Sequence, residues 1–168
     1  MLGYILTDGF KGSNTRKGMP AGSSLMTKFD IKVHTPFDPS HGAVTQSRIW
    51  GTANCRTVVD AATYQYYTSI KEKDTNAAAK PLKVTFGFYR ADQPTAGLPG
   101  KGDQAEYYTI TLEGAYVVEV KFGMEEVSSS AIGGGGVLGD FLELAFIYHK
   151  ITGKFVPGSN TWDDAWGK

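Results

Sequence analysis

Residues 106–122 read Glu106-Tyr-Tyr-Thr-Ile-Thr-Leu-Glu-Gly-Ala-Tyr-Val-Val-Glu-Val-Lys-Phe122. Apolar or aromatic side chains recur at every second position, first from Tyr108 to Leu112 and again from Tyr116 to Phe122. A period of two is typical of a strand that buries one face. Gly114 separates the two runs and predicts either a tight hairpin or a bend. The stretch therefore predicts two consecutive strand segments.

The same alternation occurs at 29–34 and 82–88, and a last long strand is expected over 141–151, with Leu142, Leu144, Phe146 and Tyr148 on one side. Only 63–70 has helical spacing, with Thr63 as the expected N-cap and Tyr66, Tyr67 and Ile70 three to four residues apart. The chain also has 21 glycines and 7 prolines, which favour strands and turns over helices. We therefore expect a mainly β protein with one short helix.

Three segments, 11–23, 91–102 and 128–139, are rich in glycine, proline or polar residues and are expected to be loops. The sequence contains no internal repeat and no linker long enough to separate two domains. A chain of 168 residues can bury a sizeable core as one unit. We therefore expect a single domain over residues 1–168.

The segment 35–49 begins Thr35-Pro-Phe-Asp-Pro-Ser-His-Gly42. Its two prolines and one glycine interrupt the strand that precedes it, and a residue before proline is pushed towards an extended conformation. We expect a stiff, extended arm. Two interpretations of this arm remain open, an ordinary exposed hairpin loop and a latch that packs on a neighbouring subunit.

Overall charge and hydropathy argue against several classes of partner. Seventeen basic and seventeen acidic residues give a formal net charge of zero, so there is no bulk electrostatic attraction to nucleic acid or to an anionic membrane. No stretch approaches the roughly 20 apolar residues that span a bilayer, and residues 1–8 lack the features of a signal peptide. Cys55 is the only cysteine, so no intrachain disulfide can form and a reducing compartment is expected.

Residues with catalytic or ligand-binding chemistry are present but do not form recognisable motifs. The run Gly133–Gly136 lacks the Gly-Lys-Ser/Thr ending of a phosphate loop. His34, His41 and His149 are not spaced as metal ligands, and no Gly-x-Ser-x-Gly nucleophile elbow occurs. We therefore expect no catalytic site, no metal and no cofactor, and hence no enzyme.

Aromatic residues leave one alternative open. Trp50, Trp162 and Trp166, together with the tyrosines of 64–67, could stack on sugars in a carbohydrate-binding β-sandwich. Tryptophan is more often found in cores and interfaces, so this function is the weaker hypothesis.

Several segments, taken together with their order along the chain, resemble the haemolysin-coregulated protein (Hcp) family of type VI secretion tube proteins. The most specific is Glu106–Glu113 followed by Ala115-Tyr-Val-Val118, which is similar to the family's EYYTITLE strand pair. The resemblance extends through Leu82-Lys-Val-Thr-Phe-Gly-Phe-Tyr-Arg90, Leu142-Glu-Leu-Ala-Phe-Ile-Tyr-His-Lys-Ile-Thr152 and the ending Thr161-Trp-Asp-Asp-Ala-Trp166. Looser matches occur at 29–39, at Arg48-Ile-Trp50 and at 59–63, whereas 10–22 and 133–136 depart from the family pattern.

The resemblance implies a β-barrel of two packed antiparallel sheets with one short flanking α-helix and an extended loop. It further implies homohexameric rings that stack head-to-tail into a hollow tube, which a contractile sheath drives outward beneath a spike protein, with effectors carried in the lumen. Assembly in the bacterial cytoplasm and export through the type VI system, without a signal peptide, are expected. A contractile phage tail tube protein is a second interpretation of the same architecture.

On this interpretation the arm is the candidate contact between subunits or rings. Phe37 is its expected apolar anchor, and Asp38 and Arg48 are its expected polar partners. The full set of candidate interface residues is Thr35, Phe37, Asp38, Pro39, Arg48 and Trp50.

Overall fold

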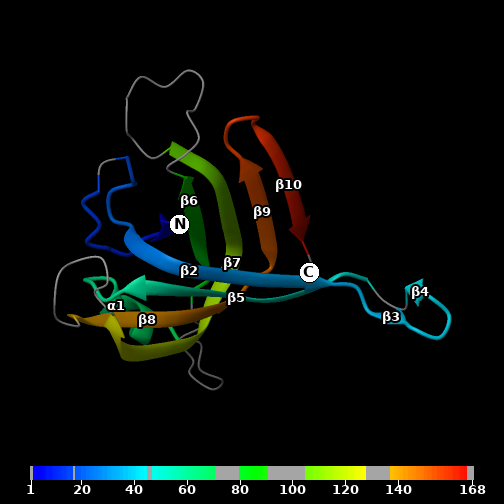
Figure 1. Cartoon of the computed structure of the whole chain (residues 1–168), viewed down its shortest axis with the longest axis horizontal. Coiled ribbons are helices and arrows are strands. Elements are labelled where there is room, and N and C mark those ends of the chain that lie inside the picture. The colour runs from blue at the N-terminus through cyan, green and yellow to red at the C-terminus, as the bar shows by residue number, and fades with distance from the viewer. Residues whose placement is uncertain are drawn as a thin grey trace.

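The structure is a computed structural model, and it describes residues 2–16, 18–44, 47–70, 80–90, 105–127 and 137–165. Within these residues the chain forms ten strands and one helix (Figure 1). In chain order the elements are β1 (Leu2–Thr7), β2 (Ser24–His34), β3 (Phe37–Asp38), β4 (Ala43–Val44), β5 (Ile49–Val58), α1 (Thr63–Thr68), β6 (Leu82–Arg90), β7 (Ala105–Val127), β8 (Val137–Ile147), β9 (Lys150–Phe155) and β10 (Asn160–Ala165).

The long strand β7 closes the sheet into a barrel. Its first half pairs with β6 and β9, and its second half pairs with β8. From β8 the hydrogen-bonded ladders continue through β5, β2 and β1 back to β6. The hairpin β9–β10 extends outward from β7 (Figure 1). The mainly β barrel with one short helix is thus confirmed, and its two layers belong to one continuous antiparallel sheet.

Gly114 allows β7 to serve both halves of the barrel. Its φ of 62° lies in the left-handed region, which residues with a Cβ rarely adopt. The strand continues through this residue from Ala105 to Val127. Of the two predictions made for Gly114, the bend is therefore confirmed and the tight hairpin is wrong.

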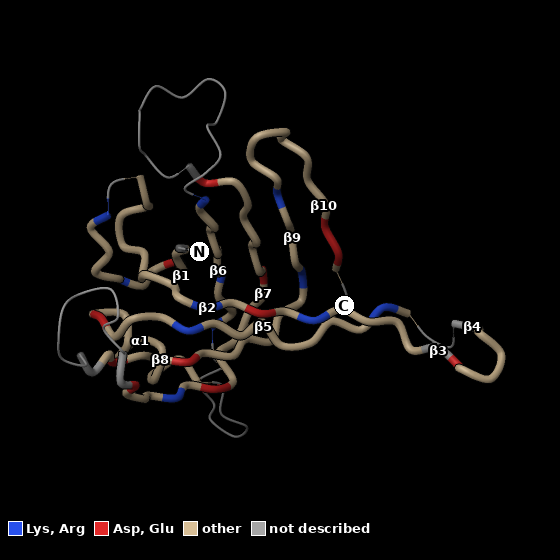
Figure 2. The backbone as a smooth tube through the Cα atoms, viewed as in Figure 1, with Lys and Arg blue, Asp and Glu red and all other residues tan. Residues whose placement is uncertain are grey.

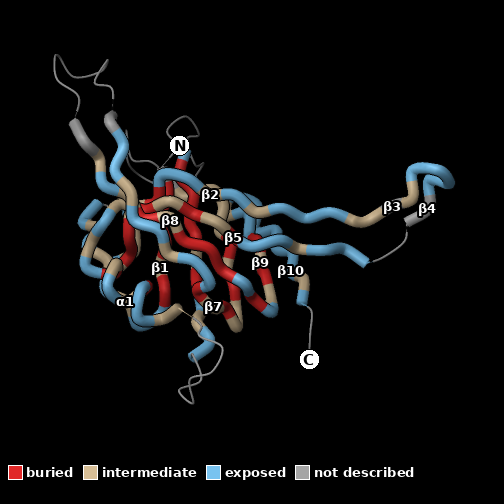
Figure 3. Tube along the Cα trace, turned by 90° about the horizontal axis from the view of Figure 1, so that it is seen from below, coloured by how far each residue is buried: buried red, intermediate tan, exposed pale blue. Residues whose placement is uncertain are grey.

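Buried residues lie along the strands of the barrel (Figure 3), and their side chains form one hydrophobic core. Leu142, Leu144, Phe146 and Tyr148 are all buried, as the alternation predicted. Helix α1 adds Tyr66, whose hydroxyl lies 3.0 Å from Thr7 Oγ1 and whose ring packs edge-on against Phe146. The fully buried side chains of this core, other than those already named, include Ile5, Thr57, Val84, Phe86, Leu112, Val117 and Ile151.

The expected strand over 141–151 is wrong in its length. β8 ends at Ile147 and β9 begins at Lys150, so the chain turns between them. The backbone N–H of His149 donates to the carbonyl of Glu113, and the buried Tyr148 hydroxyl donates to the carbonyl of Gly51. Alternation continues through the turn because Tyr148 faces the core, which is why the sequence pattern concealed the break.

The helix is shorter than the predicted 63–70, and its cap differs. The N-cap position is Ala62, and Thr63 is the first helical residue. The Thr63 hydroxyl accepts a hydrogen bond from the backbone N–H of Asp60, while Asp60 Oδ1 accepts one from the N–H of Ala62. A local turn therefore uses the Thr63 side chain, which the prediction assigned to capping, together with that of Asp60.

The expected loop at 11–23 has no strand or helix among its described residues. The expected loop at 91–102, like the glycine run Gly133–Gly136, lies outside the described residues. The expected loop at 128–139 is too long at its C-terminal end, because Val137 already begins β8.

Replacing Gly114 by Ala tests the bend. A Cβ at this position would lie 2.9 Å from His149 Cδ2 at an unfavourable φ, so we expect a loss of unfolding free energy of about 1–3 kcal/mol. Gly51→Ala is the matched control, since a Cβ there meets only ordinary van der Waals contacts of 3.5 Å or more. Urea denaturation of both variants measures the difference, and equal stability would contradict the role of Gly114.

Candidate functional site

The predicted arm is a projecting ribbon. β2 and β5 continue beyond the barrel as an antiparallel pair as far as His34 opposite Ile49, and the short pair β3–β4 lies at the far end (Figures 1 and 3). Val33 and Ile49 are about two-fifths exposed on this ribbon. The extended shape expected for 35–49 is therefore present in its described residues.

A local turn at the tip of the arm is organised by Asp38. Its Oδ1 accepts a hydrogen bond from the N–H of Ser40, and its carbonyl accepts from the N–H groups of His41 and Gly42. Its Oδ2 lies 2.9 Å from His41 Nδ1, and the pKa of Asp38 is lowered, first by this contact with His41 and then by the Ser40 N–H. Asp38 therefore shapes the tip in addition to any contact with another molecule.

Arg48 and Trp50 lie at the base of the arm, and both contact β10. Trp50 Nε1 donates to Asp164 Oδ2 over 2.9 Å, and Arg48 Nη2 lies 3.2 Å from the same oxygen. The Trp50 ring also stacks on Trp162 at an interplanar angle of 9°. Of the six candidate interface residues, these two are thus separated from Thr35, Phe37, Asp38 and Pro39, which lie nearer the tip.

The Trp50–Trp162 pair is not an open platform for sugars. Trp162 Nε1 donates to the Tyr108 hydroxyl over 2.6 Å. Its ring lies so close over Gly153 that a Cβ there would come within 2.3 Å of it. A sugar platform needs an accessible ring face, whereas this indole contacts Trp50 and Gly153 of its own chain. Trp166 lies outside the described residues.

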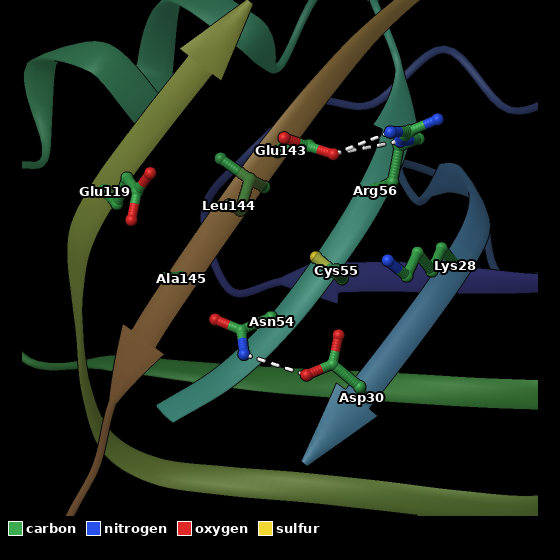
Figure 4. A pocket seen from close by; sticks show the side chains of 9 residues that line it. All are labelled: Lys28, Asp30, Asn54, Cys55, Arg56, Glu119, Glu143, Leu144 and Ala145. Carbon is green, nitrogen blue, oxygen red and sulfur yellow. Dashed lines mark hydrogen bonds and ion pairs between the residues drawn. The ribbon is translucent and has the colours of Figure 1, made fainter. Parts of the chain in front are cut away.

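A second surface of mixed charge covers the outside of the barrel, and Figure 2 shows basic and acidic positions interspersed along its strands. The ladders place two rows across β2, β5, β8 and β7. The residues of the first row are Lys28, Arg56, Glu143 and Lys121, and those of the second are Asp30, Asn54, Ala145 and Glu119. A shallow pocket, lined by all of these except Lys121, lies over them (Figure 4).

Arg56 is the centre of the charged rows. Its guanidinium contacts Glu143 Oε1 at 2.7 Å and Glu125 Oε2 at 2.6 Å, and it lies 4.0 Å above the ring of Phe141. Lys121 Nζ lies 3.1 Å from the other oxygen of Glu143. These cations, Arg56 first, hold the pKa of Glu143 below its usual range, and Glu143 raises the pKa of Arg56.

Among the described residues, no three His, Cys, Asp or Glu side chains form a group that could hold a metal ion. Cys55 borders the pocket but is buried, and this burial raises the pKa of its thiol. In the described part of the chain, no helix is long and apolar enough to cross a bilayer.

Sequence reasoning missed the two acidic residues that organise these surfaces. Asp164 and Glu143 lie in segments that carry the family resemblance, and no role was predicted for either side chain. The alternation in 141–147 did place Glu143 on the outer face, but its cationic partners come from other strands. No local signal connects Asp164 with Trp50, because 114 residues separate them.

Comparisons with known proteins agree with this architecture. Residues 4–155 match the family described as "Type VI secretion system effector, Hcp". No curated protein matches. Among solved structures, a crystal structure of an Hcp protein superposes with a TM-score of 0.78 at 14% identity, covering 99% of this chain and 98% of that one. The Hcp1 protein of E. coli EAEC 042 (a mutant form) gives 0.70 at 20% identity and 99% and 97% coverage.

The secreted protein Hcp3 from Pseudomonas aeruginosa gives a TM-score of 0.67 at 20% identity, covering 99% of each chain. At these identities the superpositions establish the fold, a closed β-barrel with a projecting arm. The family match covers most of the sequence, and the chain therefore belongs to the Hcp family of type VI secretion tube proteins.

The charged network predicts a pH response. Because the folded-state pKa of Glu143 is lowered, its stabilising contribution is present above the unfolded pKa and is lost as the pH falls through the folded pKa. Removing the cation by Arg56→Met should raise the pKa of Glu143, measured by ¹³C NMR titration of its carboxyl group. Lys83→Met, on the exposed part of β6, is the control. An unchanged titration in Arg56→Met would show that Arg56 is not the cause.

Proposed function

We propose that this chain is a ring-forming subunit of the type VI secretion tube, a structural protein and not an enzyme. Six copies would form a ring, and rings would stack head-to-tail into a hollow tube. The observation that carries the proposal is the arm, which projects from an otherwise closed barrel in a member of the Hcp family.

The physics of the arm supports assembly. A two-stranded ribbon is only marginally stable by itself in water and gains stability when it packs on another surface. If the arm of one copy packs on the barrel of the next, the contact is head-to-tail, and such contacts produce a ring when the rotation closes. Thr35, Phe37, Asp38 and Pro39, which belong to the projecting part, are the proposed contact residues, together with Arg48 and Trp50 at its base.

The remaining partners follow from the same proposal. A contractile sheath would surround the stacked rings, a spike protein would lie at the end of the tube, and effectors would travel in its lumen. Assembly would take place in the bacterial cytoplasm, followed by export through the type VI system.

Electron microscopy of the purified protein in negative stain, with sedimentation velocity on the same sample, tests the proposal. We expect six-fold rings with a central hole and a species of six times the monomer mass. A monomer throughout the accessible concentration range, both alone and mixed with its cognate spike and sheath proteins, would contradict the ring-forming function.

A substitution at the arm tests which surface joins the subunits. Burying Phe37 against a neighbour would contribute about 1.5–3 kcal/mol, so Phe37→Ala should shift the ring–monomer equilibrium towards monomer while the thermal unfolding of the monomer is unchanged. Tyr64→Ala is the control, because Tyr64 is three-quarters exposed on α1, away from the arm. Light scattering that showed the same assembly for both variants would contradict the role of Phe37.

A further inference from the structure

The direction of the arm is not fixed by the ribbon itself. The ladder between β2 and β5 shifts register twice, between Met26 and Lys28 within the barrel and between Ile31 and Val33, where the ribbon leaves it. A bulge of this kind increases local twist and bends the strand. The orientation of the arm relative to the barrel therefore depends on the contacts that hold its base.

One contact comes from the barrel side. The hydroxyl of the buried Tyr148 donates to the carbonyl of Gly51 over 3.0 Å. This hydrogen bond anchors β5 one residue inside Trp50. This hydrogen bond fixes the position where the ribbon leaves the barrel, but one contact alone still allows the ribbon to rotate about that point.

A second set of contacts comes from β10. Asp164 Oδ2 accepts from Trp50 Nε1 at 2.9 Å and lies 3.2 Å from Arg48 Nη2. Two donors two residues apart, Arg48 just before β5 and Trp50 within it, thus converge on a single carboxylate oxygen. The Asp164 side chain is less than a quarter exposed, and hydrogen bonds to an ionised acceptor are stronger than neutral ones.

Trp162 adds further contacts at the base of the arm. It lies two residues before Asp164 and therefore on the same face of β10. Its ring stacks on Trp50 with ring centroids 5.6 Å apart, and its Nε1 donates to Tyr108 on β7. Gly153, its partner on β9, leaves the space in which the ring lies. The indole of Trp162 therefore connects the base of the arm to the barrel through β7.

We propose that Asp164 and Trp162 form a clamp that sets the direction of the arm and holds it ready to bind a second copy of the chain. β10 is thereby a positioning element for assembly, although it lies more than 100 residues from the arm in sequence. Pre-organisation of this kind raises affinity because the ordering cost is met before binding. The consequence for assembly rests on the proposed function, whereas the clamp itself can be measured in the monomer.

The test compares Asp164→Ala with Asp163→Ala. Asp163 is adjacent, equally charged and on the opposite face of the same strand, so it is a matched control. Two properties are measured, hydrogen exchange of the amides at 35–44 and 47–50, and the circular dichroism couplet of the stacked indoles. Asp164→Ala should speed exchange along the arm and diminish the couplet, whereas Asp163→Ala should leave both unchanged.

The same variants are then compared in ring formation. If the free arm points correctly about a tenth of the time, the concentration needed for assembly rises about tenfold. Asp164→Asn keeps the shape of the side chain and an oxygen for Trp50 while removing the charge opposite Arg48. It should give an intermediate shift, and it carries the test if Asp164→Ala does not fold.

Each outcome is decisive. Unchanged exchange and an unchanged couplet in Asp164→Ala would overturn the clamp. A loosened arm with unaltered ring formation would overturn its role in positioning. If the wild-type chain forms no rings, the proposed function fails, while the exchange experiment still decides whether the clamp exists.

Discussion

The closure of the sheet by β7 is the constraint on which the rest of the structure depends. A single strand of 23 residues pairs with β6 and β9 along its first half and with β8 along its second. This is possible only because the strand bends at Gly114, where φ is positive. Without the bend, β8 would have no partner on that side, and the ladders from β5 to β1 would remain an open, edged sheet.

Closure of the barrel determines which residues lie on its inner face and which lie on its outer face. Inside, alternate residues of the strands form one core, which Tyr66 of α1 completes by packing on Phe146 and meeting the hydroxyl of Thr7. Outside, neighbouring strands bring charges into register, so that Arg56 lies between Glu143 and Glu125. The outer network therefore depends on the same cross-strand register as the core, although the residues it joins are up to 87 positions apart in sequence.

Local patterns predicted the elements whose cause is local. Alternation identified the inner faces of β6, β8, the barrel part of β2 and the first half of β7, and the prolines of 35–49 identified the arm. In the second half of β7 the predicted inner face is wrong: Val117 is fully buried whereas Val118 and Phe122 are exposed, and the register shifts between Val117 and Glu119. The failures have a common physical origin. Tyr148 keeps the alternation while the chain turns, and Asp60 organises the turn ahead of α1, so in both places a hydrogen bond decided the backbone. Of the longer strands, β1, β5 and β10 were not predicted from alternation, and the expected strand 141–151 reached only the first two residues of β9. Asp164 and Glu143 draw their roles from strands distant in sequence, which periodicity cannot reveal.

A closed barrel has its backbone hydrogen bonds satisfied around its circumference, so any backbone pairing with another copy in the proposed assembly has to come from what is added to it. In the described residues this chain adds two elements, the arm between β2 and β5 and the outer hairpin β9–β10, where β10 forms the edge of the sheet. An exposed sheet edge and a projecting ribbon are each a means of joining chains. In this chain the arm and the β9–β10 hairpin are connected to each other, because Trp50 and Arg48 at the base of the arm contact Asp164 of β10. A change in either element therefore alters the contacts of both, and in the proposed assembly the arm and β10 would act as a single unit drawn from two distant parts of the sequence.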